Sequence, residues 1–213
     1  MSSKFAITIT RQYGSGGHLI GKKIAKDLGI SCYDKELIKI AAKESGLGKD
    51  FIENSDEKLP FRFFGGITGA ISGVFGAQYN EDINDSIFKI QSGIIKNIAE
   101  KESAVFVGRC ADYVLREHPK CLNVFIYANL EDRIKNISTV FNTDSTGALK
   151  EIEKNDKQRN KYYGYYTNIE RGNAAFYHLC VNSSALGIDE TADFICKFAA
   201  KKFTIPQEIK GNR

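Results

Sequence analysis

Three glycines stand close together near the start of the chain, where an apolar run gives way to a helical pattern. The stretch FAITITRQYGSGGHLIGKKIAKDLG spans residues 5–29. Glycines at such a junction let successive backbone N–H groups turn toward one anion, and the positive end of the following helix adds to the attraction. The stretch therefore predicts a phosphate-binding loop made of Tyr13, Gly14, Ser15, Gly16, Gly17 and His18.

A second register of the phosphate-loop pattern on the same sequence has to be rejected. Residues 16–23, GGHLIGKK, spell the GxxxxGK pattern of a phosphate loop. However, the apolar residues from Leu19 to Leu28 already follow helical spacing, so Gly21 and Lys22 are expected inside the helix. Lys23 also lacks the hydroxyl that such loops use to hold magnesium.

In the preferred register the loop lacks its lysine. That position is Gly17, and the hydroxyl position falls on His18 or Leu19. The backbone cradle is kept while the side-chain charge is lost. Arg11 at the mouth of the loop or Lys22 in the helix could supply a cation, and Arg11 is the favoured candidate.

The elements around the loop alternate between strands and helices. Strands are expected at residues 5–10, 30–33, 104–108, 122–128 and 177–184, and helices at 34–46, 84–102, 146–166 and 189–203, with another beginning at 130. Asp34 and Asp189 are candidate N-caps. Since the central strands are apolar throughout, the pattern predicts a parallel sheet with helices on both faces. Ligands of such sheets bind beyond the carboxyl ends of the strands, here residues 11–17, 34, 108–112 and 182–184.

Composition sets the broader class. The chain has 213 residues, 42% of them hydrophobic and 26% charged, with a net charge of +4, which fits one globular domain over residues 1–213 that binds anionic ligands. Neither nucleic-acid binding nor a membrane span is expected, although the Gly-rich stretch 61–77 approaches the length of a span. It is interpreted as a flap or a subunit contact, so a homodimer is one possible assembly. Five scattered cysteines, no zinc spacing and no signal peptide predict a cytoplasmic protein with reduced thiols.

Several segments together resemble the cytidylate kinase-like family of P-loop proteins. They are residues 7–38 around the loop, VFVGRCADYVL at 105–115, DKQRNKYYGYYT at 156–167 and YHLCVNSSALGIDE at 177–190. The resemblance implies a P-loop NTPase-like sheet with a mobile helical lid at 142–172 and a small acceptor-binding insert at 47–83. It also implies ATP and Mg²⁺ as cofactors and nucleotides as substrates, and no side chain is assigned to the metal.

The resemblance carries roles to individual positions. It implies that loop residues 11–18 hold the donor phosphates, that Arg133 binds phosphate and that Arg159 belongs to the lid. It also implies that Asp34, Gln91 and Arg109 bind the acceptor. Lys161 stands at a position where the lid of the family carries an arginine. Two roles are open for Asp112: an ion pair with Arg109 or a contact with an acceptor hydroxyl. Arg11, Arg133 and Arg159 are the predicted catalytic residues.

The expected function is ATP-dependent phosphoryl transfer to a nucleoside monophosphate, with CMP or dCMP first. Two alternatives stay open. Gly17 favours a non-catalytic nucleotide-binding regulator, because the loop lysine is gone. Gln158, which stands where the lid carries an aspartate that reads the ribose, favours a kinase for another small acceptor.

Overall fold

The computed structural model describes residues 4–34 and 77–204. Its centre is one sheet of five parallel strands in the order β2-β3-β1-β4-β5. The strands are β1 (Ala6–Arg11), β2 (Ser31–Tyr33), β3 (Ala104–Val107), β4 (Cys121–Tyr127) and β5 (Leu179–Asn182). The predicted parallel α/β sheet is confirmed, and strand boundaries differ from those expected by one or two residues.

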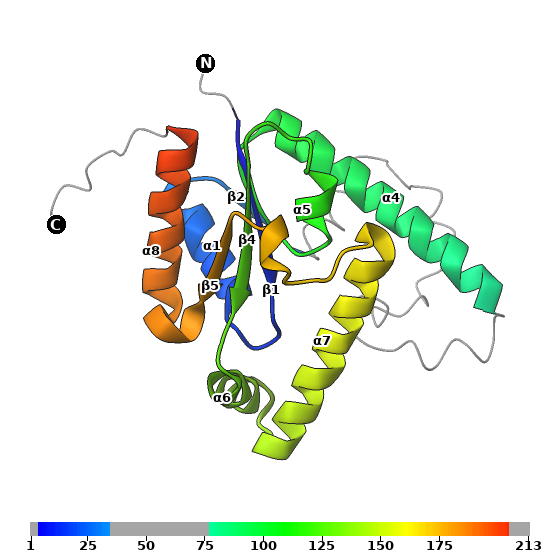
Figure 1. Cartoon of the computed structure of the whole chain (residues 1–213), viewed down its shortest axis with the longest axis vertical. Helices are drawn as coiled ribbons and strands as arrows, with labels where there is room; N and C mark the ends of the chain where they lie inside the picture. The colour runs from blue at the N-terminus through cyan, green and yellow to red at the C-terminus, as the bar shows by residue number, and fades with distance from the viewer. Residues whose placement is uncertain (1–3, 35–76, 205–213) are drawn as a thin grey trace, which may run out of the picture.

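Helices cover both faces of this sheet (Figure 1). On one face lie α1 (Gly17–Leu28) and α8 (Ser183–Phe203), and on the other lie α4 (Ala77–Lys101) and the short α5 (Ala111–Val114). The helices α6 (Leu130–Phe141) and α7 (Ser145–Thr167) lie beyond the carboxyl ends of the strands, and the 3-10 turn η2 (Ala174–Phe176) leads into β5. All strands run the same way, so their carboxyl ends and α7 share one end of the molecule.

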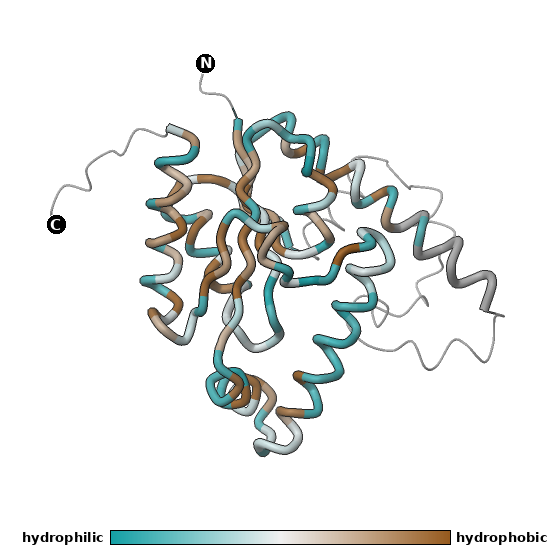
Figure 2. Tube along the Cα trace, viewed as in Figure 1, coloured by the Kyte–Doolittle hydropathy of each residue, from teal (hydrophilic) through white to brown (hydrophobic). Residues whose placement is uncertain are grey.

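Around the sheet, the described core forms two apolar layers, one on each face. Side chains of β1, β3 and β4 pack with α1 and α8 in the larger layer, where Ile7, Ile24 and Ile195 are fully buried. The smaller layer contains Phe106 of β3 and Ile95 of α4. Figure 2 shows the strands as the most hydrophobic part of the trace and α7 as largely hydrophilic. The chain therefore places its rigid core under the strand ends and a polar helix over them.

The start of the last helix differs from the expectation. The predicted strand 177–184 ends at Asn182, whose side-chain oxygen accepts from the Ser184 N–H at 2.9 Å and caps α8. The prediction of Asp189 as the N-cap is wrong. Gly187 (φ 75°, ψ 179°) interrupts the helix in a conformation that side chains rarely adopt. The sequence pattern detected the regular helix after this interruption and missed the turn before it.

Part of the predicted organisation lies outside the described residues. This holds for the helix expected at 34–46 beyond its first residue, for most of the insert at 47–83 and for nearly all of the Gly-rich stretch 61–77. Helix α4 begins at Ala77, seven residues before the expected start. In the described ranges, no helix is both long and apolar enough to cross a membrane.

Candidate phosphate-binding site

The glycine loop connects β1 to the first turn of α1. Gly14 (φ 82°) and Gly16 (φ 74°) both adopt the left-handed conformation. A side chain at Gly14 would also come within 3.0 Å of the Arg133 carbonyl oxygen. Within the described ranges, the N–H groups of Gly14, Gly16 and Gly17 have no hydrogen-bond acceptor. Three backbone donors at a helix N-terminus are thus available to an anion.

The carbonyl groups of the loop are held by surrounding side chains. The Arg133 Nε donates to the Tyr13 oxygen at 2.7 Å, Asn136 donates to the Gly14 oxygen at 2.9 Å, and the Ser183 hydroxyl donates to the Ser15 oxygen at 2.8 Å. These donors come from α6 and from the first residue of α8. The loop therefore has a fixed shape without a ligand, as a preorganised binding site requires.

The register of the loop is the one expected. Helix α1 runs from Gly17 to Leu28, so Gly21 and Lys22 lie inside it. A Cβ atom at Gly17 would lie 2.7 Å from the Arg11 Cβ and 2.9 Å from its Cγ. At Gly108, after β3, a Cβ atom would overlap the Arg11 Nη1. The Arg11 side chain therefore extends from the lysine position of the loop to the end of β3.

Four arginines gather at these strand ends: Arg11, Arg109, Arg159 and Arg171. Burial lowers the pKa of Arg11 well below its usual value, and the charges of the other three lower it further. Burial also lowers the pKa of Arg109, and burial followed by the charge of Arg171 lowers the pKa of Arg159 to about 10. All three remain protonated at neutral pH. Like charges at close range raise each other's energy, so this cluster is suited to an anion.

Asp156 of α7 connects the predicted lid to the loop. Its carboxylate accepts from the Tyr13 N–H at 3.0 Å and from Arg171 at 2.9 Å, and it forms a short ion pair with Arg133. Arg159 and Arg171 also donate to the Arg11 carbonyl oxygen, at 3.2 Å and 2.6 Å. The guanidinium of Arg159 lies 5.1 Å from the centre of the Tyr13 ring. Region 142–172 is thus packed against the loop in this structure.

The segment after β3 has an unusual backbone. Gly108, Arg109 and Cys110 all have positive φ angles, of 79°, 62° and 53°. Such conformations cost about 1–3 kcal/mol for residues other than glycine and occur mainly where the surrounding structure imposes them. The turn keeps Arg109 close enough to Arg11 for their charges to interact. The strain therefore coincides with the placement of a predicted substrate-binding residue.

The remaining predicted residues occupy different surroundings. The Asp34 Oδ2 lies 3.6 Å from the His18 Nδ1, so the chain at the end of β2 lies beside the loop. Gln91 of α4 is only 5% exposed, and its Oε1 has no hydrogen-bond partner among the described residues. Asp112 is 4% exposed and accepts from the Tyr163 hydroxyl at 2.7 Å, so it joins α5 to α7. Lys161 is exposed on α7. The substrate roles of these residues stay predictions.

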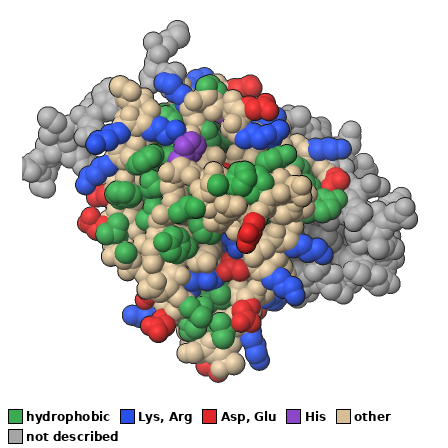
Figure 3. Space-filling view, viewed as in Figure 1, with side chains coloured by type: hydrophobic (Ala, Val, Ile, Leu, Met, Phe, Trp, Pro, Cys, Tyr) green, Lys and Arg blue, Asp and Glu red, His purple; other side chains and the backbone are tan. Residues whose placement is uncertain are grey.

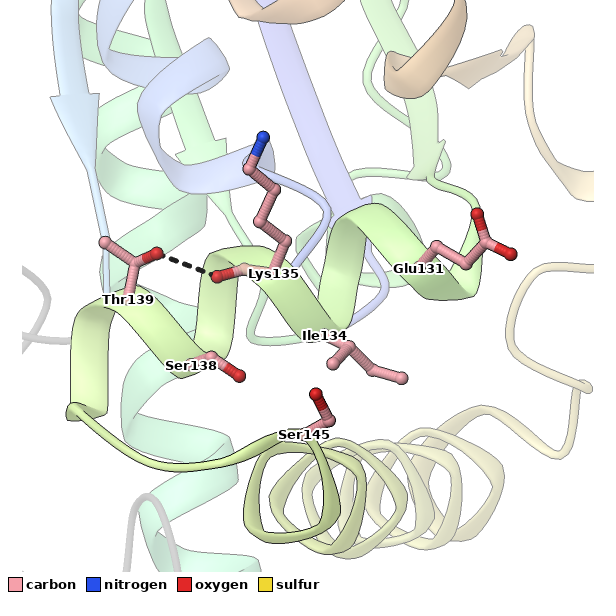
Figure 4. Close-up of a pocket in the computed structure, with 6 residues that line it drawn as sticks. All are labelled: Glu131, Ile134, Lys135, Ser138, Thr139 and Ser145. Carbon is pink, nitrogen blue, oxygen red and sulfur yellow. Dashed lines mark hydrogen bonds between the residues drawn. The ribbon is translucent and has the colours of Figure 1, made fainter.

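The surface offers little sign of this arrangement. On the face drawn in Figure 3, Lys and Arg side chains are spread among acidic and apolar ones. A pocket of about 470 Å³ lies between α6 and the first residue of α7, lined by Glu131, Ile134, Lys135, Ser138, Thr139 and Ser145. Figure 4 shows Ile134 and Ser145 facing each other across it, while Lys135 points away toward α1. None of the predicted site residues lines this pocket.

Sequence reasoning missed Asp156 and Arg171. Asp156 precedes Arg159 by three positions, so both lie on one side of α7, and this i,i+3 spacing was the available signal. Arg171 precedes Gly172, a glycine with φ 92° in the connection between α7 and β5. An arginine beside a turn glycine is a weak signal, and only the fold shows that this connection passes the loop.

The sheet order and the glycine loop between β1 and α1 define a P-loop kinase fold. The sequence model of the cytidylate kinase-like family matches residues 6–185, and the chain belongs to this family. A cytidylate kinase from Pyrobaculum calidifontis is 24% identical over 155 residues, which cover 68% of this chain and 84% of that protein.

Two solved structures support the fold. An uncharacterised protein from Eubacterium ventriosum matches with a TM-score of 0.68 and 27% identity, covering 92% of this chain and 98% of that one. A shikimate kinase from Acinetobacter baumannii, solved with shikimate, matches with a TM-score of 0.51 and 10% identity, covering 94% and 95%. The second likeness concerns the fold alone.

Proposed function

We propose that the protein transfers the γ-phosphoryl group of ATP to a nucleoside monophosphate, with CMP or dCMP as the first candidate. The observation that carries this proposal is that four arginines gather at the carboxyl ends of the strands, beside three loop N–H groups that have no acceptor among the described residues. Family membership supports nucleotide phosphotransfer in general. The preference for CMP rests on the name of the Pyrobaculum calidifontis relative.

The chemistry needs charge and position more than acid–base groups. A phosphate oxygen of the acceptor attacks the γ-phosphorus of ATP, the bond to the β,γ-bridging oxygen breaks, and ADP leaves with that oxygen and its electron pair. Since the attacking oxygen is already ionised, no general base is needed. Arg11 and Arg159 stabilise the charge of the transferring group, and the loop N–H groups hold the donor phosphates. Closure of α7 excludes water, which would otherwise compete as the acceptor.

Magnesium is proposed to enter with the nucleotide. In the described part of the chain, no group of three His, Cys, Asp or Glu side chains could hold a metal ion. Mg²⁺ often uses substrate phosphates and waters with one or two carboxylates, and Asp34 near the loop is the candidate carboxylate. When bound, the ion neutralises phosphate charge. The side chains of this chain orient the nucleotide around it.

An ADP-release assay over a panel of acceptors tests the proposal. Turnover with CMP or dCMP is the expected result. Turnover only with another acceptor would favour a different kinase, as Gln158 suggests. Tight ATP binding without turnover would favour a regulator, as Gly17 suggests.

The role of the lid is tested with a pair of variants on α7. Arg159→Ala should lower kcat by at least about tenfold, because it removes a cation beside the loop. Lys154→Ala removes the same charge from an exposed position on α7 that pairs with Glu151 at 3.4 Å, so its activity should stay within about twofold of the wild type. Unchanged turnover in Arg159→Ala would refute the lid assignment.

A further inference from the structure

We propose that Arg11 replaces the missing loop lysine, and that positions 17 and 108 are glycines because the Arg11 side chain occupies the space beside them. The inference rests on the proposed phosphate-binding function and deepens it. The cation of the loop comes from the last residue of β1 instead of from the first turn of α1. A lysine at position 17 and an arginine at position 11 are then alternatives that exclude each other.

The contact at Gly17 involves the least mobile part of the arginine. A Cβ atom there would lie 2.7 Å from the Arg11 Cβ and 2.9 Å from its Cγ, closer than real Cβ atoms approach other atoms. These stem atoms are fixed by the backbone of β1 and cannot move away as the end of a side chain could. Gly17 is the first residue of α1 and has no positive φ angle. The reason for a glycine at this position is therefore steric.

The contact at Gly108 involves the other end of the same side chain. A Cβ atom at Gly108 would overlap the Arg11 Nη1 and lie 3.2 Å from its Cζ. Two glycines from different elements thus border one arginine, Gly17 at its stem and Gly108 at its guanidinium. This places the guanidinium between the loop and the strained turn that carries Arg109.

Arg11 also contacts the lid through its backbone. Its carbonyl oxygen accepts from Arg159 and from Arg171, so one residue joins β1, the turn after β3 and α7. A guanidinium presents a planar fork of donors that can hold two phosphate oxygens, whereas an ammonium acts as a point charge. The exchange of lysine for arginine therefore keeps a cation at the phosphates, but the cation reaches them from strand β1 instead of from helix α1.

Exchange of the two residues tests this inference. The wild type, Arg11→Gly, Gly17→Lys and the double variant are compared for binding of ATP and of inorganic tripolyphosphate by calorimetry. Arg11→Gly should weaken ATP binding about 10- to 100-fold through loss of a charged contact. Gly17→Lys should weaken it as well, although it adds a positive charge, because the lysine stem collides with Arg11. The double variant should recover to within about tenfold of the wild type, a non-additive result that residues in contact give.

Two glycine pairs provide the controls if a lysine at position 17 prevents folding. Gly108→Ala is compared with Gly29→Ala, because both glycines have positive φ angles but a Cβ at Gly29 meets no described atom within 4 Å. Gly17→Ala is compared with Gly93→Ala in α4, where the space is likewise open among the described residues. Substitution of Gly17 or Gly108 should weaken ATP binding at least about tenfold, and substitution of the control glycines should change it less than twofold.

The outcomes separate this inference from the proposed function. If the wild type binds neither ATP nor tripolyphosphate, both are refuted. If the wild type binds ATP but the two single effects simply add in the double variant, only the replacement of lysine by Arg11 is refuted. Gly17→Lys binding ATP as tightly as the wild type, or Gly108→Ala behaving like Gly29→Ala, would refute it equally.

Discussion

The apolar core and the arginine cluster are both largely withdrawn from solvent, yet their side chains are satisfied to different degrees. In the core, Ile7, Ile24 and Ile195 are fully buried among other apolar groups. At the strand ends, burial and then the charges of Arg159, Arg109 and Arg171 lower the pKa of Arg11. Burial stabilises the first set, whereas in the second set burial and the neighbouring positive charges disfavour the charge of Arg11. The core is complete in the free protein, whereas under the proposed function an anion completes the cluster.

The backbone shows the same difference. The core strands are regular, while the turn after β3 places Arg109 and Cys110 in left-handed conformations. Repulsion and strain at one end of the sheet lower stability unless a ligand compensates for them. This difference supports the proposal that this end binds a ligand, while the rest of the sheet supplies the stability of the fold.

The largest expected effect comes from the core. Ile195→Ala should lower the free energy of unfolding by about 2–5 kcal/mol, because it leaves a cavity between α8 and the sheet. Phe194→Ala on the same helix should cost much less, since Phe194 is 47% exposed. Urea unfolding measures both. Tripolyphosphate should raise the urea midpoint of unfolding in Ile195→Ala as it does in the wild type. If the ligand no longer raised the midpoint in this variant, the core and the binding site would not be independent.

A smaller effect is expected inside the cluster, where two arginines should differ. Arg171 donates to Asn160, to the Arg11 carbonyl and to Asp156, so Arg171→Ala should cost about 1–3 kcal/mol of stability. Among the described residues, Arg159 donates one hydrogen bond, to the Arg11 carbonyl, and burial disfavours its charge there. Arg159→Ala should therefore cost less stability while weakening ATP binding more. Equal stability losses in urea unfolding would show that both arginines are structural.

The fold could be predicted from the sequence, because the patterns that indicate its strands and helices are local and recur along the chain. Continuous apolar strands such as 104–107 between amphipathic helices leave few arrangements other than a parallel sheet. The cap of α8 was missed because Gly187 breaks the helix in a way that periodicity cannot show. Only the structure distinguishes the short first turn at Ser183 from the end of a strand.

The site was harder to predict from the sequence than the fold, because its contacts join residues that are distant along the chain. The sequence located the loop, the missing lysine at Gly17 and the candidacy of Arg11. It could not reveal that the Arg11 side chain fills the space beside Gly17 and Gly108, because Gly108 is distant from both residues along the chain. Arg171 also had no local signal that distinguished it from a solvated arginine.

The strained turn can be tested by a stability difference of about 1 kcal/mol between a glycine and an alanine variant, with a sign opposite to the usual one. Glycine normally destabilises an exposed helix position relative to alanine by about 1 kcal/mol. At Cys110 the order should reverse, because a left-handed residue other than glycine costs roughly 1–2 kcal/mol. Cys110→Gly should thus be more stable than Cys110→Ala by about 1 kcal/mol, measured by thermal unfolding. If Cys110→Ala is the more stable protein, the turn is not strained and the contrast with the core weakens.

The smallest effect concerns Asp112, a buried carboxyl that borders both regions. Burial raises its pKa, while the hydrogen bond from Tyr163 partly offsets this. Below the unfolded pKa of about 4, both states hold the proton. As the pH rises above 4, the unfolded chain releases the proton first, so the stability of the wild type should fall relative to that of Asp112→Asn until the folded pKa is passed. The Tyr163 hydrogen bond limits this difference, because it offsets part of the effect of burial on the pKa.

Urea unfolding from pH 4 to pH 8 measures this difference, with Asp132→Asn on the exposed side of α6 as the control. The control should follow the wild type at every pH. A difference between the wild type and Asp112→Asn that does not change with pH would mean that the Asp112 charge is compensated in the folded chain. Weaker CMP binding in Asp112→Asn at unchanged stability would instead favour the substrate role predicted from the sequence. In that case Asp112 would belong with the arginine cluster, and the boundary between the two regions would lie deeper in the fold than the hydrogen bond to Tyr163 indicates.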